Sequence, residues 1–413
     1  MNVWRNFSQI LTLEKAYLKD GRKLLPEDIS TIDNAAIAFD DFQILWVGED
    51  KDLPEEFLTN TSSHIKDFSG YVLTPELVDS HTHLIFAGDR SQEYTMRLNG
   101  ASYQDIANAG GGILSTVLQT NKLDAEELFK LCIKRIDNLV EHGIGTIEIK
   151  SGYGLSFDKE YQLSHVIHQL KQYFSPHIQI INTYMAAHAI PKEFNSSSEY
   201  MDQVVIPLLK KLAEEEIIDC VDIFHEKGYF SSQDTEKLFD MALILGLKFK
   251  SHADEFQDNK GALLAATKGA VSTDHLLCTN DDGIKALANS STVATLLPGT
   301  GYFLGKPQSQ ARKFLDQGVK VAFATDYNPG SCHCDNLLLL ASIAAANLEL
   351  NQTELWTAIT LNAGHALGLQ DQGCLIKDLA PRFSLFKATN IDQITYNWGK
   401  NLAVNFSHFL PKR

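Results

Sequence analysis

Eight apolar, strand-like runs follow one another after residue 71, and this repetition constrains the fold more than any other feature of the sequence. Longer segments with helical periodicity separate them, such as 124–143, which opens with acidic residues and closes on Gly143. Strands that alternate with helices are typical of βα units and a parallel sheet, and eight units can close into a (β/α)8 barrel. The runs are YVLTPELVDSHTHL, GIGTIEIKSGYGL, IQIINTYMAAHAI, CVDIFHEKGYF, LKFKSHADEF, AVSTDHLL, STVATLLPGTGYF and VKVAFATDYNPGS.

The two ends of the chain follow a different pattern. Short apolar bursts broken by polar turns fill the first 70 residues, and AAIAFDDFQILWVGED predicts two strands joined at its two aspartates. The end of the chain returns to short strand-like segments, as in CLIKDLAPRFSLFKATN. We therefore predict an α/β fold in which a TIM barrel spans 71–370, and a small β-sandwich domain is formed by 1–70 together with 371–413.

The composition narrows the class of ligand and the compartment. A formal net charge of −16 argues against a nucleic-acid surface, because polyanion binding needs clustered Lys and Arg, so we expect a small-molecule substrate. Neither a secretory signal nor an apolar stretch of about eighteen residues is evident, so we expect no membrane span. The six cysteines are scattered and do not form a disulfide framework, which favours a reducing, cytoplasmic environment.

Two histidines end the first barrel run, in VDSHTHLIFAGDR. Side chains on a strand alternate between its faces, so His81 and His83 point to the same side and could share one metal ion. The alternative interpretation is a pair of polar residues where a strand reaches solvent. A hydrolytic metal ion usually has three or four protein ligands and an open position for water, so further ligands must come from other strands.

Two other runs supply candidates for these further ligands. His252 ends a run that begins at Leu247, and Asp326 ends a run that begins at Val319 and contains no other acid. A carboxylate at the end of a buried strand is costly unless it is paired or bound to metal. Because active sites of (β/α)8 barrels lie at the carboxyl ends of the strands, we predict that these two residues join the histidine pair around one ion.

Two more residues near these strand ends could move protons. Glu255 lies three residues after His252, and we predict that it transfers a proton between a water molecule and the substrate. His275 is predicted to hydrogen-bond that water or the oxyanion that forms. The alternatives are a solvated loop acid for Glu255 and an ordinary strand-end histidine for His275.

The motifs that contain these residues are similar to those of the amidohydrolase superfamily. Four short motifs carry this resemblance: HTH (81–83), HADE (252–255), DH (274–275) and ATD (324–326). Four further motifs resemble the imidazolonepropionase family in particular, and the resemblance covers almost the whole chain. They are HTHLIFAGDR, KSGYGL (150–155), AAHAIP (186–191) and DYNPGS (326–331).

The resemblance implies a function in histidine degradation: hydrolysis of the cyclic amide of 4-imidazolone-5-propanoate to N-formimidoyl-L-glutamate by a metal-activated water. It implies one zinc or iron ion per chain, and we expect a homodimer. The implied metal ligands are His81, His83, His252 and Asp326, with Glu255, His275 and Asp326 as catalytic residues. The implied contacts are Arg90, Tyr103, Tyr153, His188, Glu255 and Ser331 with the substrate, and Asn328 and Gly330 with the product.

Arg90 also fits this role on physical grounds. A substrate with a propionate group calls for a guanidinium, which can bind a carboxylate through two parallel hydrogen bonds. The alternative is a surface arginine paired with the neighbouring Asp89. Tyr153 lies in a turn flanked by glycines, from which its ring could cover the substrate heterocycle.

The chain departs from the family pattern in two places. Cys332, His333 and Cys334 follow the DYNPGS motif and invite a second metal site, but a closed thiolate site needs four ligands and no CxxC partner exists. The segment LAPRFSLF lacks the usual acid after its alanine, which leaves the packing of the small domain open.

Three other functions stay open at this point. A purine or pyrimidine deaminase would use the same ligands but would not need an arginine for an aliphatic carboxylate. A binuclear cyclic amidase could use a carboxylated Lys227 to bridge two ions. A non-catalytic scaffold is disfavoured because all four predicted ligands are present.

Overall fold

The computed structural model describes residues 1–61, 63–102, 105–106 and 109–404. Its larger sheet has eight strands in sequence order, and each described neighbour pair is parallel. The predicted alternation of strands and helices is therefore confirmed. The strands are β6 (Leu77–Asp79), β7 (Ile144–Lys150), β8 (Gln179–Ala187), β9 (Cys220–His225), β10 (Lys248–Ala253), β11 (Ser272–His275), β12 (Val293–Leu296) and β13 (Val321–Phe323).

The first and last strands of this sheet meet just beyond their carboxyl ends, which closes the barrel. Thr82 forms an isolated parallel bridge with Tyr327, and the Asp326 amide donates to the carbonyl of His81 at 3.0 Å. The buried carboxylate of Asp79 accepts hydrogen bonds from both the amide and the hydroxyl of Thr325. The chain thus brings the end of β6 against the end of β13.

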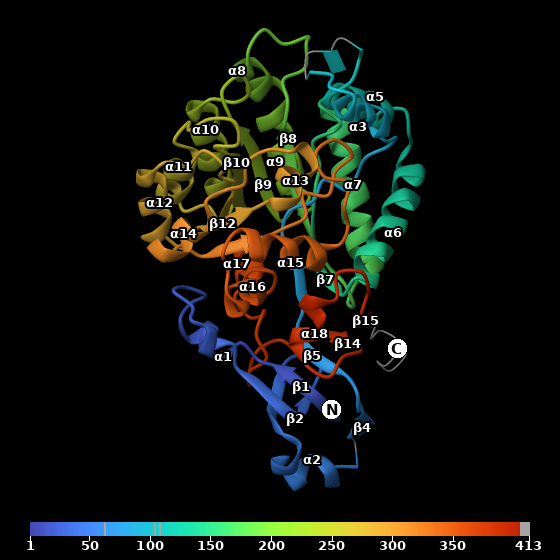
Figure 1. Ribbon diagram of the computed structural model, residues 1–413. Helices are drawn as coiled ribbons and strands as arrows, with labels where there is room; N and C mark the ends of the chain where they lie inside the picture. Colours follow the sequence, from blue (N-terminus) through green and yellow to red (C-terminus); the bar gives the residue numbers. More distant parts are fainter. Residues whose placement is uncertain (62, 103–104, 107–108, 405–413) are drawn as a thin grey trace.

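Helices surround the barrel strands, as Figure 1 shows. The segment 124–143 forms α6, with Asp124 and Glu127 in a reciprocal capping box and with Leu128, Cys132, Ile136 and Leu139 on its buried face. Among the described residues, the α-helices between β6 and β14 are α3 (Ser91–Leu98), α5 (Ile113–Thr120), α6 (Ala125–Glu141), α7 (Phe157–Phe174), α8 (Ser197–Tyr200), α9 (Ile206–Glu214), α10 (Ser232–Ile244), α11 (Gly261–Lys268), α12 (Asp281–Ala288), α13 (Pro298–Leu304), α14 (Ala311–Gln317), α15 (Leu337–Asn347), α16 (Gln352–Ala358) and α17 (Leu361–Ala366).

The two ends of the chain form a separate seven-stranded sheet. Its central strand β1 pairs antiparallel with β2 and parallel with β4 and β5, and β14 from the end of the chain pairs with β5. Trp4, Phe7, Phe39, Phe68 and Phe383 form its aromatic core. The strands are β1 (Asn2–Leu11), β2 (Thr31–Phe39), β3 (Ile44–Glu49), β4 (His64–Asp67), β5 (Val72–Pro75), β14 (Phe383–Phe386) and β15 (Ala403–Val404), and the remaining helices are α1 (Glu14–Leu18), α2 (Glu55–Thr59) and α18 (Ile391–Tyr396).

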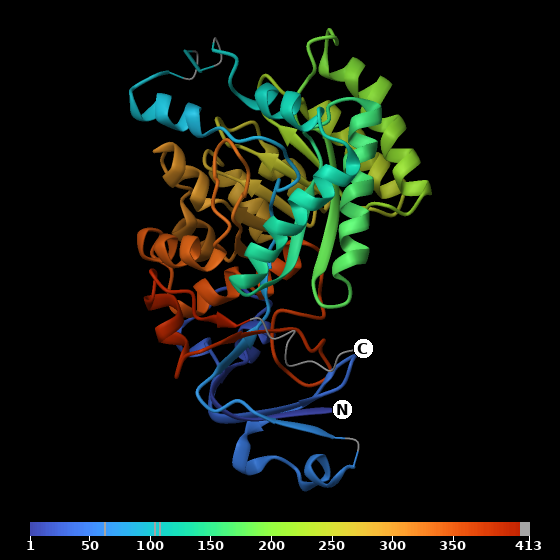
Figure 2. The ribbon, with the colours of Figure 1, turned by 90° about the vertical axis from the view of Figure 1, so that its right-hand side faces the viewer.

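This terminal sheet lies at the end of the barrel where the strands begin, as both ribbon views show (Figures 1 and 2). The Ser384 hydroxyl donates to the carbonyl of Gly143, just before β7, and Arg382 forms an ion pair with Glu76, just before β6. The carboxyl ends of the barrel strands therefore face away from the terminal sheet. The division of the chain at residues 70 and 370 stays a prediction.

Neither disulfides nor membrane-spanning helices are found among the described residues. All six cysteines are free, as their scattered positions predict. Among the helices that the structure describes, none is long and apolar enough to cross a membrane.

Candidate active site

Three histidines meet at the carboxyl ends of β6 and β10, and we call His81, His83 and His252 the histidine cluster. The His83 Nε2 atom lies 3.3 Å from His81 Nε2 and 3.1 Å from His252 Nε2. All three side chains are buried, with at most 3% of each residue exposed. Residues that are 169 positions apart in the chain therefore share one point at the mouth of the barrel.

The donor atoms of the histidine cluster fit a metal cation. His81 Nδ1 lies 2.6 Å from an Asp274 carboxylate oxygen, and His252 Nδ1 lies 3.1 Å from an Asp222 oxygen. Each carboxylate favours the Nδ1–H tautomer, so the facing Nε2 atoms carry lone pairs. Burial, with nearby positive charges, holds the pKa of His81 and that of His83 well below the usual value. Neutral rings that turn their lone pairs toward one another need a shared cation.

Asp326 completes a set of three nitrogens and one oxygen. Its Oδ1 atom lies 3.6 Å from His81 Nε2 and 3.8 Å from His83 Nε2, while its Oδ2 atom accepts a hydrogen bond from the Thr300 hydroxyl. Its backbone has a φ of 52°, a left-handed conformation that is uncommon outside glycine and clusters at functional sites. Zinc and iron accept such a donor set.

A buried group of five charged residues lies beneath the histidines, and we call Glu148, Lys150, Asp222, Lys250 and Asp274 the buried ion network. The Lys150 ammonium contacts Glu148 at 2.6 Å and Asp222 at 2.7 Å, and the Lys250 ammonium contacts Asp274 at 2.9 Å and Glu148 at 3.3 Å. Each of these side chains is fully buried. Burial opposes a charged lysine, but Asp274 and Glu148 raise the pKa of Lys250 above its usual value.

The charge of this network supports the same conclusion. Three carboxylates and two ammonium groups leave one net negative charge, and the Asp326 carboxylate adds another. Buried charge is costly unless an opposite charge balances it. A divalent cation at the histidine cluster would balance these six groups.

Glu255 and His275 lie together beside the histidine cluster. Glu255 Oε2 is 3.8 Å from His275 Nδ1, and the His275 ring centroid lies 5.1 Å from that of His252. Burial, with repulsion from Asp326 and Glu226, raises the pKa of Glu255 to about 8. Burial also holds the pKa of His275 well below its usual value, so the ring is neutral.

Glu226 holds the loop that carries Glu255, a role that no sequence motif indicates. One of its carboxylate oxygens accepts hydrogen bonds from the backbone amides of Glu255 and Phe256, at 3.0 and 2.9 Å. The other oxygen accepts from the Asn259 side chain. An alternative reading of Glu255 as a solvated loop acid is not supported, because only 14% of its side chain is exposed.

Tyr153 and His188 also lie beside the histidine cluster. The His188 ring stacks on His83 with centroids 4.8 Å apart, and the Tyr153 ring lies 5.4 Å from His188. The buried Glu160 carboxylate accepts hydrogen bonds from the amides of Gly152, Gly154 and Leu155 and so holds the turn that carries Tyr153. Both predicted substrate residues therefore border the candidate metal centre.

The loop after Asp326 brings Asn328, Gly330 and Ser331 to the same mouth. The Asn328 side chain donates to the Asp326 carbonyl and the Ser331 hydroxyl, and accepts from the amides of Gly330 and Ser331. These bonds use its amide group to shape the loop. The Ser331 hydroxyl lies 3.4 Å from the Asp326 carboxylate.

Arg90 contacts this loop at Gly330. Its guanidinium packs so closely on Gly330 that a Cβ there would come within 2.0 Å of Arg90 Nη1. It forms an ion pair with Glu93 at 2.7 Å, and Asp89 instead accepts from Ser91, so pairing with Asp89 is not seen. Tyr103, the remaining predicted contact, lies outside the described residues.

Two alternative metal arrangements find no support in the geometry. Lys227 is exposed, so it does not lie among the buried histidines. Cys332 is buried and Cys334 half-buried, and His333 packs its ring against Phe86 and Tyr327. Among the described residues, the only compact group of potential metal-ligating side chains is the histidine cluster.

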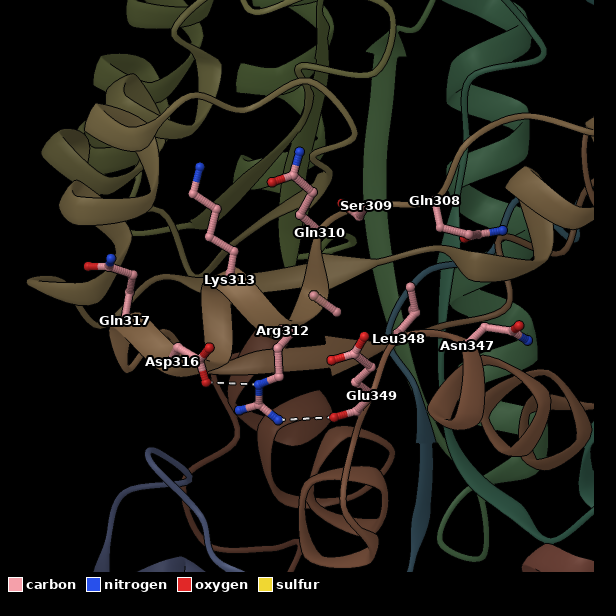
Figure 3. A pocket seen from close by; sticks show the side chains of 11 residues that line it. Gln308, Ser309, Gln310, Arg312, Lys313, Asp316, Gln317, Asn347, Leu348 and Glu349 are labelled. Carbon is pink, nitrogen blue, oxygen red and sulfur yellow. Dashed lines mark hydrogen bonds and ion pairs between the residues drawn. The ribbon is translucent and has the colours of Figure 1, made fainter.

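A surface pocket of about 630 Å³ lies beside α14 and contains none of the predicted site residues (Figure 3). Arg312 on its wall pairs with Asp316 and with Glu354. Ser309 also lines it, and its hydroxyl donates to the carbonyl of Leu276, next to His275. The pocket is therefore connected to the turn at His275 through Ser309, but no residue of the histidine cluster lines it.

Comparisons with known proteins give relatives but no matching family model. The chain is 40% identical over 369 residues to a Bacillus cytotoxicus protein named imidazolonepropionase, covering 89% of this chain and 85% of the relative. A Bdellovibrio bacteriovorus protein of the same name is 38% identical and covers 89% of this chain and 86% of the relative. Another, from Caldanaerobacter subterraneus subsp. tengcongensis, is 37% identical and covers 95% of this chain and 94% of the relative.

Solved structures with the same fold are more distant in sequence. A triazine hydrolase variant superposes with a TM-score of 0.74 at 15% identity, covering 97% of this chain and 92% of the other. Atrazine chlorohydrolase TrzN from Arthrobacter aurescens TC1, solved in complex with zinc, gives a TM-score of 0.70 at 15% identity, covering 98% of this chain and 93% of the other. At this identity the likeness shows the fold alone.

Proposed function

The chain belongs to the imidazolonepropionase family, and from this premise we propose that it hydrolyses the cyclic amide of 4-imidazolone-5-propanoate to N-formimidoyl-L-glutamate. The observation that carries the proposal is the meeting of the histidine cluster, Asp326, Glu255 and His275 at one end of the barrel. Metal-assisted hydrolysis needs this combination of a cation site and adjacent proton-transfer groups.

We propose that His81, His83, His252 and Asp326 hold one zinc or iron ion. When bound, such an ion supplies Lewis-acid chemistry, which makes water nucleophilic near neutral pH and polarises a carbonyl group. Asp222 and Asp274 keep two of the histidines oriented with their Nε2 atoms toward that point.

Glu255 is proposed to transfer the proton. The water oxygen forms a bond to the ring carbonyl carbon while Glu255 accepts a water proton, and the carbon–nitrogen bond then breaks as that proton passes to the departing nitrogen. The carbonyl carbon becomes a carboxylate, so the product has two carboxylates where the substrate had one. Burial raises the pKa of the Glu255 carboxyl above its usual value, toward the range in which one group can both accept and return a proton near neutral pH.

His275 is proposed to stabilise the oxygen that gains charge during attack. Its neutral ring lies next to that of His252 and can offer one N–H to this oxygen. Tyr153 and His188 would pack against the heterocycle from the other side, and Ser331 would hydrogen-bond to it. Arg90 would bind the propionate.

The direct test is to incubate the purified protein with 4-imidazolone-5-propanoate and to follow substrate and product by mass spectrometry. Zinc and iron are added separately to chelator-treated protein. We expect N-formimidoyl-L-glutamate to form only with metal. Conversion of guanine or cytosine without any action on the imidazolone would overturn the proposal and favour a deaminase. The expected homodimer is tested by sedimentation velocity.

A further inference from the structure

Arg90, which is proposed to bind the carboxylate of the substrate, already has Glu93 as an ion-pair partner. Arg90 Nη2 lies 2.7 Å from Glu93 Oε2, and the other Glu93 oxygen accepts the amide of Gly112 at 3.1 Å. A Cβ on Gly111 would come within 2.9 Å of the Glu93 carboxyl group, so the loop closes tightly over it. Arg90 and Glu93 together contribute no net charge to the mouth of the barrel.

A second arginine, in the last turn of α3, contacts the same glycine as Arg90. Arg90 is the residue that precedes α3, and Arg97 lies in the last turn of this helix. Arg97 Nη1 lies 3.3 Å from the Gly330 carbonyl oxygen, and Arg90 packs on the Cα of the same glycine. The two guanidinium groups therefore flank the loop that follows Asp326.

Arg97 has no carboxylate partner within ion-pair distance among the residues that the structure describes. Its guanidinium instead lies 5.3 Å from the Phe303 ring centre and 5.9 Å from that of Tyr94. Aromatic faces orient a guanidinium without neutralising it. The three charged side chains Arg90, Glu93 and Arg97 thus leave one net positive charge beside Gly330.

We propose that Arg97 is a second carboxylate-binding residue, which supplies the net positive charge for the substrate's propionate while Glu93 holds Arg90 in position to donate hydrogen bonds to it. This inference rests on the proposed function for the identity of the ligand. Arg97 would bind the carboxylate equally in the substrate and in the transition state, because the propionate takes no part in the bond that breaks. Its loss should therefore raise KM and leave kcat nearly unchanged.

The test compares the wild-type holoenzyme with Arg97→Gln and Arg97→Lys variants. The ligands are the substrate, its uncharged propanamide analogue and the non-hydrolysable probe imidazole-4-propanoate. We expect Arg97→Gln to raise KM for the substrate and Kd for the probe by about 10- to 100-fold, the range for a charge-assisted hydrogen bond. Arg97→Lys should raise KM for the substrate and Kd for the probe by a smaller factor. Neither variant should change KM for the amide. Lys130→Gln, which breaks an exposed ion pair with Glu126 on α6, is the control.

Two results would overturn the inference. One is an unchanged Kd for imidazole-4-propanoate in Arg97→Gln. The other is an equal rise in KM for the acid substrate and for its amide analogue. An equal rise in KM would mean that Arg97 acts only by holding the Gly330 loop in position. Wild-type protein that binds the probe but hydrolyses no imidazolone would contradict the proposed function alone, because calorimetric binding reports Arg97 independently of turnover.

Discussion

The floor of the site, formed by the histidine cluster and the buried ion network, differs sharply from the rim formed by Arg90 and Arg97. On the floor at most 3% of any histidine is exposed and each network charge has an opposite partner. On the rim, 16% of the Arg90 side chain is exposed, and Arg97 has no carboxylate within ion-pair distance among the described residues. The difference indicates that the floor is built to hold a cation in fixed geometry, whereas the rim leaves one charge for a ligand to neutralise.

The largest effect should come from the floor. Asp326→Asn removes the only predicted oxygen ligand but keeps the size of the side chain. We expect at least about a 10⁴-fold fall in kcat/KM together with loss of bound metal, because a Lewis-acid ion contributes several kcal/mol to catalysis. Metal analysis and steady-state kinetics on the same sample check this. Retention of both metal and activity would show that the ligand assignment is wrong.

The Glu255→Gln variant separates proton transfer from metal binding. Glutamine cannot accept the water proton, so we expect activity to fall by about 10²- to 10⁴-fold while the metal content stays that of the wild type. A fall in metal content would instead indicate that Glu255 is itself a metal ligand.

Asp222→Asn weakens the support of His252. Its carboxylate contacts His252 Nδ1 at 3.1 Å and the Lys150 ammonium at 2.7 Å. Removing such a partner typically costs about 10- to 100-fold in metal affinity, which competition with a fluorescent chelator measures. Asp240→Asn, which removes a surface ion pair with Lys268, is the control and should leave affinity unchanged. Equal affinities in the two variants would mean that the network serves folding only.

The smallest effect concerns stability and pH. Burial raises the pKa of Glu255 to about 8, against about 4.3 in an unfolded chain. Between these values the folded metal-free protein holds a proton that the unfolded chain has released, so its stability falls as the pH rises from about 5 to about 8. We expect metal-free Glu255→Gln to melt about 2–4 °C above the wild type at pH 8 and at a similar temperature at pH 5. A difference that is equal at both pH values would contradict the pKa shift.

The same contrast explains how much the sequence could predict. The barrel and the positions of His81, His83, His252 and Asp326 at strand ends follow from strand order and side-chain alternation, and the coordinates bring these residues together. The buried ion network could not be predicted. A charged strand residue is buried only where an opposite charge lies close in space, and such partners are far apart in the chain, as with His81 and Asp274, which are 193 positions apart. Periodicity does not specify such pairs.

The rim could be predicted only in part. Arg90 was identified from its motif, but its partner is Glu93, one helical turn away, rather than the adjacent Asp89. The spacing of Arg90, Glu93 and Arg97 was a usable signal, provided that a helix was expected to begin at Ser91. The roles of Glu160 and Glu226 depend on backbone amides of distant turns, which no local pattern reveals.

We propose that one cation lies where the three histidine Nε2 atoms and the Asp326 carboxylate converge. Anomalous diffraction from crystals grown with zinc measures this directly. We expect a single strong peak in contact with His81, His83, His252 and Asp326. A peak elsewhere, two peaks bridged by a lysine, or none at this position would contradict it.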